Sequence, residues 1–185
     1  MRSLFRRNHL KEAAERAYDA VVAQARRTEF FMCCGVPDTL DGRFELICAH
    51  AFLYLYRLKE EPPPAPKLGQ VFFDAMFADF DRSLRELGTG DLSVGREVKK
   101  MAQAFYGRIQ GYEQGLQYGD AVLGAALSRN LFGTACPDPA QVAAMGGYMR
   151  RESVRLRDED RQRLLAGHVF FGAPPEPALA DERVS

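Results

Sequence analysis

Residues 71–116 decide the fold of this chain and read VFFDAMFADFDRSLRELGTGDLSVGREVKKMAQAFYGRIQGYEQGL. The first part repeats apolar side chains in steps of four and three, at Phe73, Phe77, Phe80, Leu84 and Leu87. The last part repeats them in the same way, at Val98, Ala102, Phe105, Ile109, Tyr112 and Leu116. Side chains with this spacing share one face of a helix, so each part predicts an amphipathic helix.

A short turn with the sequence GTGD, at residues 88–91, joins these two helices. Gly88 can adopt the left-handed conformation that ends a helix. Asp91 or Ser93 can accept hydrogen bonds from the free amides that begin the next helix. Because the connection is so short, we expect an antiparallel helical hairpin with a shared core.

Similar local signals place the other helices. We expect a first helix at about residues 10–32, a second that is capped by Asp38 or Thr39 and extends to Leu58, a short one at residues 120–133, and a last one from the capping box at residues 138–141 to about residue 168. No alternating polar and apolar run predicts a strand. The fold class is therefore all-α: a single-domain bundle of about six helices built around the antiparallel helical hairpin.

The chain divides into three segments. Residues 1–9 form a basic N-terminal lead-in, residues 10–171 form the helical domain, and residues 172–185 lack apolar periodicity and are expected to be disordered. Within the domain, the prolines at residues 62–66 exclude helix and predict a stiff, extended connector, with a docking motif for a partner as the alternative.

The composition excludes several classes of protein. Lys plus Arg equals Asp plus Glu, at 25 each, so no overall basic field favours nucleic acid as a specific ligand. The most apolar run, residues 44–58, is shorter than the roughly 20 residues that span a bilayer. The four cysteines lack a C-x-x-C pair, and no secretory signal precedes them, so we expect a cytoplasmic protein with reduced thiols.

Two sets of residues are candidates for chemistry. His50 lies on an apolar helix, where it could be an axial ligand of haem or a hydrogen-bonded core residue. Asp74, Asp79 and Asp81 are spaced by five and two residues, which scatters them around a helix instead of gathering them at one metal site. We therefore expect no catalytic residues, no metal, no cofactor, and no enzyme activity.

A row of glycines is the most unusual pattern in the chain. Gly107, Gly111, Gly115 and Gly119 recur every four residues on the second helix of the hairpin, where each glycine costs about 0.5–1 kcal/mol relative to alanine. The row has two interpretations: close packing by the first or last helix of the same molecule, or a groove for a partner's helix. In the second case Arg96, Lys99, Lys100 and Arg108 would give the groove a cationic border.

Two arginine-rich segments suggest a separate possibility. Arg2, Arg6 and Arg7 lie near the start of the chain, and residues 150–163 contain six arginines and four acids. These segments fit either solvated helices or a peripheral contact with a membrane surface.

The hairpin also resembles a known family. The sequences FFDAMFADFDRSLRELG (72–88), GDLSVGREVKKMAQAFYGR (90–108) and GVPDTLDGRFELICAHAFLYLYRLK (35–59) are similar to those of the ubiquinol–cytochrome c chaperone family. This resemblance implies an assembly factor that accompanies newly made cytochrome b, alongside a second assembly factor near the ribosome. Because the N-terminal extension of mitochondrial relatives is missing, the resemblance implies the bacterial type.

The resemblance therefore implies an assembly chaperone that binds cytochrome b during biogenesis of the ubiquinol–cytochrome c reductase, and the lack of a catalytic set of residues agrees with a binding protein. The expected partner-binding residues are Arg96, Lys99, Lys100, Tyr106, Gly107, Arg108, Gly111 and Gly115. The alternative function is a helical enzyme or binding protein for an isoprenoid or haem-like ligand, which would require His50 or the aspartates to converge on a pocket.

Overall fold

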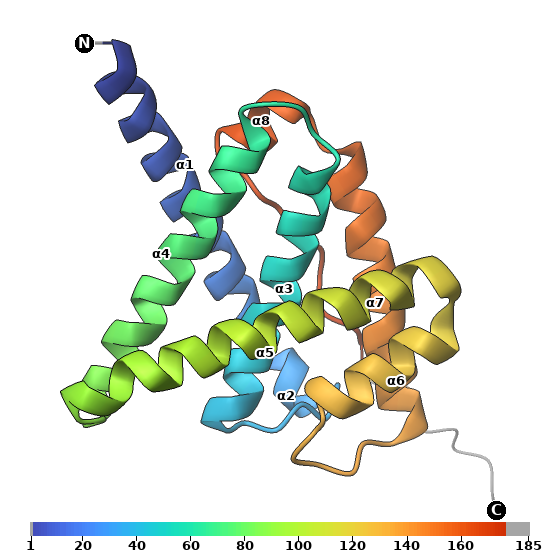
Figure 1. Cartoon of the computed structure of the whole chain (residues 1–185). Coiled ribbons are helices and arrows are strands. Elements are labelled where there is room, and N and C mark those ends of the chain that lie inside the picture. Colours follow the sequence, from blue (N-terminus) through green and yellow to red (C-terminus); the bar gives the residue numbers. More distant parts are fainter. Residues whose placement is uncertain (1, 177–185) are drawn as a thin grey trace, which may run out of the picture.

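The structure, a computed structural model, describes residues 2–176, with the side chains of residues 2–7 and of Leu92 left out. It contains the helices α1 (Arg2–Ala25), α2 (Glu29–Met32), α3 (Leu40–Lys59), α4 (Ala65–Glu86), α5 (Asp91–Tyr118), α6 (Asp120–Asn130), α7 (Pro139–Asp158) and α8 (Arg161–Leu165) (Figure 1). Six are long, two are single turns, and no strand occurs in residues 2–176. The prediction of an all-α, single-domain bundle is confirmed.

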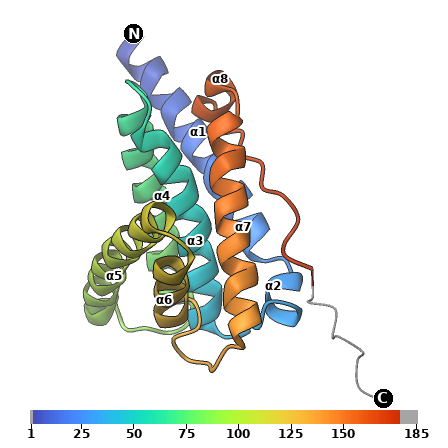
Figure 2. The same ribbon diagram turned by 90° about the vertical axis from the view of Figure 1, so that its right-hand side faces the viewer.

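Helix α3 is the centre of the bundle. It packs against α1, α4, α5 and α7, which surround it in Figures 1 and 2. Its side chains are buried around most of its circumference, including Leu46, Phe52, Leu53 and Tyr54, which are at most 1% exposed. Burying each such side chain stabilises the fold by about 1.5–3 kcal/mol, so α3 anchors the core.

No helix in the described part of the chain is long and apolar enough to cross a bilayer.

Helices α4 and α5 form the expected hairpin. Gly88 adopts a φ of +84°, and the amide of Thr89 donates to the Leu84 carbonyl at 3.0 Å, which ends α4 as predicted. The rings of Phe73 and Phe77 meet the ring of Phe105 with centroids 6.1 and 6.2 Å apart. Figure 1 shows the two helices diverging from the turn, so that α5 crosses the front of α3.

The caps at the helix starts were predicted well, with one exception. The Thr39 hydroxyl accepts from the Gly42 amide at 3.1 Å, and the capping box at Asp138 and Gln141 is complete. At α5, however, the N-cap is Gly90 and makes no side-chain cap bond. Asp91 instead accepts from Arg85 at 2.5 Å, because the arginine at the end of α4 lies across the turn from it.

Three predicted boundaries differ from the structure. Helix α1 begins at Arg2 instead of Leu10, so the basic lead-in continues into the helix, and the chain bends after Ala25 before the short α2. The proline-rich stretch is not extended: Pro62–Pro64 turn, and α4 begins at Ala65 with Pro66 in its first turn, where proline is tolerated. The last expected helix is divided into α7 and α8, because Asp160 caps a new helix start.

The prediction of a disordered C-terminal tail from Gly172 is wrong for its first residues. Residues 166–176, called the strap below, run without helix from α8 along α7, on the side of α3 opposite to α5 (Figure 2). Backbone groups of Gly172 and Ala173 are hydrogen-bonded to α1 and α7. Residues 177–185 lie outside the described residues, so the prediction for them stays a prediction.

Candidate functional site

The outward side of α5 is the candidate site. We define the α5 outer face by its exposed residues Arg96, Lys99, Lys100, Gln103, Tyr106, Gly107, Gln110 and Gln114. Steps of three and four along α5 bring these residues to one side of the helix, opposite to the buried Phe105 and Tyr112. Figure 2 shows α5 at the edge of the bundle, away from α7 and the strap. Four of the predicted partner-binding side chains therefore share one exposed surface.

The charge on the α5 outer face is positive. Its three charged members are Arg96, Lys99 and Lys100, and none of the exposed residues that define the face is acidic. Glu97 lies beside them and accepts from Lys100 at 3.0 Å, while its distance to Arg96 is 3.5 Å. Exposed pairs of this kind are weak, so both cations remain available to an acidic or polar partner.

An aromatic pair adds an apolar anchor to this face. The Tyr106 side chain is 60% exposed, and its ring stacks on Phe73 of α4 with centroids 5.6 Å apart. Phe73 in turn contacts Phe77, whose ring centroid is 4.5 Å away, so the pair is backed by the core of the hairpin. An exposed tyrosine on a rigid aromatic support is typical of residues that carry binding energy at protein interfaces.

Arg108 does not belong to this face, although the sequence analysis placed it there. Its guanidinium turns toward α3 and forms a two-pronged ion pair with Glu45, with the Nε–Oε2 distance at 2.5 Å. Its charge also lies over the Phe44 ring, 5.4 Å from the centroid. Burial raises the pKa of the Glu45 carboxyl, and the hydrogen bond and charge of Arg108 oppose that rise. Arg108 is a structural residue.

The glycine row is likewise mostly internal. A Cβ atom at Gly115 would lie 2.6 Å from the Cα of Leu123 on α6, and one at Gly111 would lie 3.5 Å from the Ala126 Cβ. The neighbour predicted within the molecule was the first or last helix. The structure instead places α6 there, because Gly119, with a φ of +115°, folds α6 back onto α5. Gly111 and Gly115 therefore cannot line an external groove, and only Gly107 remains exposed.

Alanine substitutions in this row are expected to have opposite effects. Gly115→Ala should lower the free energy of unfolding by about 2 kcal/mol, because overpacking against the α6 backbone outweighs the gain in helix propensity. Gly107→Ala should raise it by about 0.5–1 kcal/mol, since no described atom lies within 4 Å of the added Cβ. Urea unfolding followed by circular dichroism measures both. Equal shifts would contradict the packing described here.

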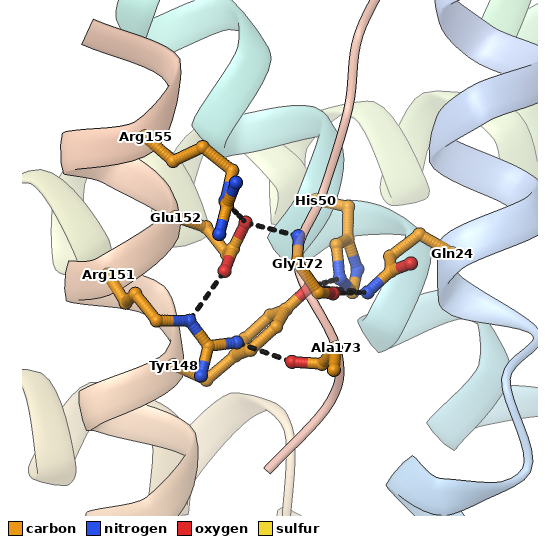
Figure 3. Close-up of polar contacts among 8 residues, drawn as sticks. All are labelled: Gln24, His50, Tyr148, Arg151, Glu152, Arg155, Gly172 and Ala173. Atoms are coloured by element: carbon orange, nitrogen blue, oxygen red, sulfur yellow. Dashed lines mark hydrogen bonds and ion pairs between the residues drawn. The ribbon is translucent and has the colours of Figure 1, made fainter. Parts of the chain in front are cut away.

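His50 is a satisfied core residue (Figure 3). Its Nδ1 lies 2.7 Å from the Leu46 carbonyl, which can only accept, so Nδ1 carries the proton. Its Nε2 lies 2.7 Å from the Tyr148 hydroxyl and accepts from it. Burial lowers the pKa of His50 to about 4, with the Leu46 hydrogen bond opposing the shift. Both ring nitrogens are occupied, so His50 offers no lone pair to a metal or haem.

The three aspartates of α4 diverge. Asp74 accepts from Gln70 on its own helix, Asp79 accepts from Tyr18 of α1 at 2.9 Å, and Asp81 accepts from Arg85. Within residues 2–176, no group of three histidine, cysteine or acidic side chains is close enough to hold a metal ion. The arrangements on which the isoprenoid and haem alternatives depended are therefore not present in this part of the chain.

The arginine-rich segment of α7 and α8 is used within the molecule. Arg150 donates to the carbonyls of Gly115 and Leu116, which ends α5, and it also pairs with Asp120. Four of the other five arginines pair with acids: Arg151 and Arg155 with Glu152, Arg161 with Glu61, and Arg163 with Glu159. These contacts favour the interpretation as a structural helix. The side chains of Arg2, Arg6 and Arg7 lie outside the described residues.

Sequence reasoning missed the buried polar cluster around His50. Gln24 donates to the Tyr148 hydroxyl at 2.9 Å, which links α1 to α7 through the ring of Tyr148 (Figure 3). Glu152 is completely buried and accepts from Arg151 at 2.8 Å. The sequence shows Glu152 between Arg151 and Arg155 on one helix. Its burial depends on the strap, however, and the strap has no apolar periodicity from which its position could be predicted.

The fold and this exposed face define a class of protein: an all-helical domain that presents a cationic and aromatic helix surface. The model of the family described as "Ubiquinol-cytochrome C chaperone" matches residues 33–171, which is most of the chain and includes α3, α5 and α7. The chain belongs to this family.

Individual relatives agree with this assignment. The chain is 30% identical over 163 residues to ubiquinol-cytochrome-c reductase complex assembly factor 1 of Xenopus laevis, which covers 88% of this chain and 82% of that protein. It is 30% identical over 156 residues to the assembly factor 1 of Mus musculus, and spans 53% of that protein. Its structure is similar to the crystal structure of the Cbp3 homolog from Brucella abortus, with a TM-score of 0.81, 37% identity, and coverage of 92% of this chain and 96% of that chain.

Proposed function

We propose that this protein is an assembly chaperone that binds newly made cytochrome b and assists biogenesis of the ubiquinol–cytochrome c reductase. Family membership supports the assembly role, since the relatives are named reductase assembly factors. The observation that carries the binding role is the α5 outer face, where three cations precede an exposed tyrosine that is supported by Phe73.

The chemistry of this face fits an unassembled membrane protein. Tyr106 and Phe73 offer a rigid aromatic surface to an apolar segment of the client. Arg96, Lys99 and Lys100 can pair with acidic or polar loop residues at the ends of such a segment. In this proposal Arg108, Gly111 and Gly115 support the face from behind and do not touch the client.

The proposed place of action follows from the proposed client. Because cytochrome b is inserted into the membrane, the chaperone would work in the cytoplasm, at the membrane's inner surface, in peripheral contact with it. A second assembly factor or the ribosome is the expected neighbour at this stage. Cell fractionation tests this placement: recovery only in the cytosolic fraction, also while reductase is being assembled, would contradict it.

Reversing the charge of this face is expected to weaken client binding. The variant Lys99→Glu/Lys100→Glu/Tyr106→Ala is produced in cells that lack the wild-type gene. Affinity purification of this variant should recover on the order of tenfold less cytochrome b, because the loss of one aromatic anchor and two cations costs about 1–2 kcal/mol of binding free energy. Assembled reductase should fall in parallel, and unrelated respiratory enzymes should stay at their normal level.

A matched control separates this effect from a general effect of charge. Lys11→Glu/Lys67→Glu reverses two exposed lysines on α1 and α4, away from the α5 outer face, and should behave like the wild type. If deletion of the gene leaves reductase at its normal level, the assembly role is wrong. If the α5 variant is folded and still recovers cytochrome b fully, the assembly role stands but the binding face is elsewhere.

A further inference from the structure

The strap runs without helix between α1 and α7 and passes α3 (Figure 3), and the surface of these three helices that it covers is called the groove below. Its centre is held by main-chain contacts from both sides. The Gly172 amide donates to Glu152 Oε2 of α7 at 2.7 Å, and the Gly172 carbonyl accepts from Gln24 Nε2 of α1 at 2.8 Å. The Ala173 carbonyl accepts from the Arg151 guanidinium. Main-chain recognition of this kind is how proteins bind extended peptides.

The side chains of the strap fill defined positions in the groove. The Phe171 ring meets the His50 ring edge to face, with centroids 5.0 Å apart, and Pro174 is buried. At Gly172 an added Cβ atom would lie 2.8 Å from Glu152 Oε1 and 3.1 Å from Arg155 Nη2, so a side chain there would have to displace the Glu152–Arg155 ion pair. The groove therefore favours an aromatic residue, then a glycine, and a proline two positions after the glycine, whereas the side chain of Ala173 is exposed and its position sets no requirement.

The groups that line the groove are positioned by residues other than the strap. Glu152 is held by Arg151 and Arg155, at 2.8 and 3.2 Å, and Gln24 by the Tyr148 hydroxyl. Departure of the strap would leave each of Glu152 and Gln24 short of one hydrogen bond, at fixed positions. Residues 166–168 are hydrogen-bonded to the end of α8 and stay with it. Residues 169–176 contain no helix, so this part of the strap can leave without unwinding any helix.

We propose that this groove is a binding site for an extended polypeptide segment of a client, and that the strap occupies it in cis. A client segment with an aromatic residue, a glycine directly after it and a proline two positions later would replace the strap. The groove lies on the side of α3 opposite to the α5 outer face, so the two surfaces can be occupied independently (Figure 2).

Occupation in cis predicts how a peptide binds in trans. A strap that is closed most of the time lowers the apparent affinity for a competing peptide by the fraction of molecules that are open. A fluorescent peptide with the sequence of residues 167–176, GHVFFGAPPE, is titrated against the full chain and followed by anisotropy. The variant Gly172→Val, whose own strap no longer fits, should bind this peptide at least on the order of tenfold more tightly than the wild type.

Two controls accompany the titration. Gly147→Val makes the same substitution on the exposed side of α7, where no described atom lies within 4 Å, and should bind the peptide as weakly as the wild type. A peptide in which valine replaces the glycine should bind neither protein. A Gly172→Val protein that melts cooperatively but fails to bind the wild-type peptide would overturn the proposal.

Hydrogen exchange tests the same proposal without any substitution. In the wild type, the amides of residues 169–173 should exchange by local opening, well before those of α3, and saturating peptide should accelerate their exchange. If they exchange only together with α3, the strap is a permanent part of the fold and the proposal is wrong. A dimer that exchanges straps between two copies would also overturn it, because the occupant would then be a second copy of this chain.

Discussion

Arg108→Ala is expected to lower the free energy of unfolding by about 3 kcal/mol, because it leaves the Glu45 carboxylate unpaired inside the protein. Glu45 is 6% exposed, and Arg108 is the cation that the structure places against it. Removal of that cation takes away the interaction that opposes the burial-driven rise in the Glu45 pKa. Urea unfolding at neutral pH, followed by circular dichroism, measures the loss.

Lys100→Ala is the matched control for this prediction. Lys100 lies two turns earlier on α5, its side chain is exposed, and its pair with Glu97 is solvated, so the change should stay within about 0.5 kcal/mol. Adding Glu45→Gln to Arg108→Ala should restore part of the loss, since the buried charge is then removed. If Arg108→Ala alone costs as little as Lys100→Ala, the pair is not structural.

The contrast between Arg108 and Lys100 shows where sequence reasoning reached its limit. The helical periodicity of α5 predicted an outward position for both residues. Arg108, however, lies one turn before the buried Tyr112, near the border of the inner face. Its direction is decided by Glu45, which is 63 positions away in the chain, and no local pattern records that contact.

The same division between local and distant information explains the rest of the fold. Turns and caps such as Gly88, Thr39 and Asp138 were predicted correctly, because their chemistry is complete within four residues. The glycine row was recognised as a close-packed surface, but its neighbour α6 depends on how Gly119 turns the chain. The order of residues 172–176 was missed, because their partners Gln24 and Glu152 are provided by distant helices.

His50 should make the protein sensitive to acid well above the range in which carboxylates titrate. An unfolded histidine has a pKa of about 6.5, whereas burial lowers the pKa of His50 in the folded state to about 4. The unfolded state therefore binds a proton first as the pH falls. Stability is unaffected above about pH 7, decreases between pH 6.5 and pH 4, and by the end of that window is lower by about 3 kcal/mol.

Protonation of His50 is unfavourable in the folded state because a proton on Nε2 would point at the Tyr148 hydroxyl, which itself donates a hydrogen to Nε2. The hydroxyl would have to rotate before it could accept that proton. Tyr148 donates its hydroxyl hydrogen to Nε2 and accepts from Gln24, so protonation of His50 would break the chain of hydrogen bonds from α3 to α1. The same chain supports Gln24, which holds the strap at the Gly172 carbonyl. We therefore expect acid to loosen the strap before it unfolds the bundle.

Unfolding free energies at pH 7 and pH 4.5 measure this effect, with an expected loss of about 2.5 kcal/mol from His50. His168→Gln, which removes an exposed histidine of the strap, should keep the whole loss. His50→Gln should have a lower free energy of unfolding than the wild type at pH 7. Its free energy of unfolding should then decrease less between pH 7 and pH 4.5, because the titrating imidazole is absent. Equal losses in His50→Gln and the wild type would show that His50 is not the proton-binding group, and that surface carboxylates account for the acid sensitivity.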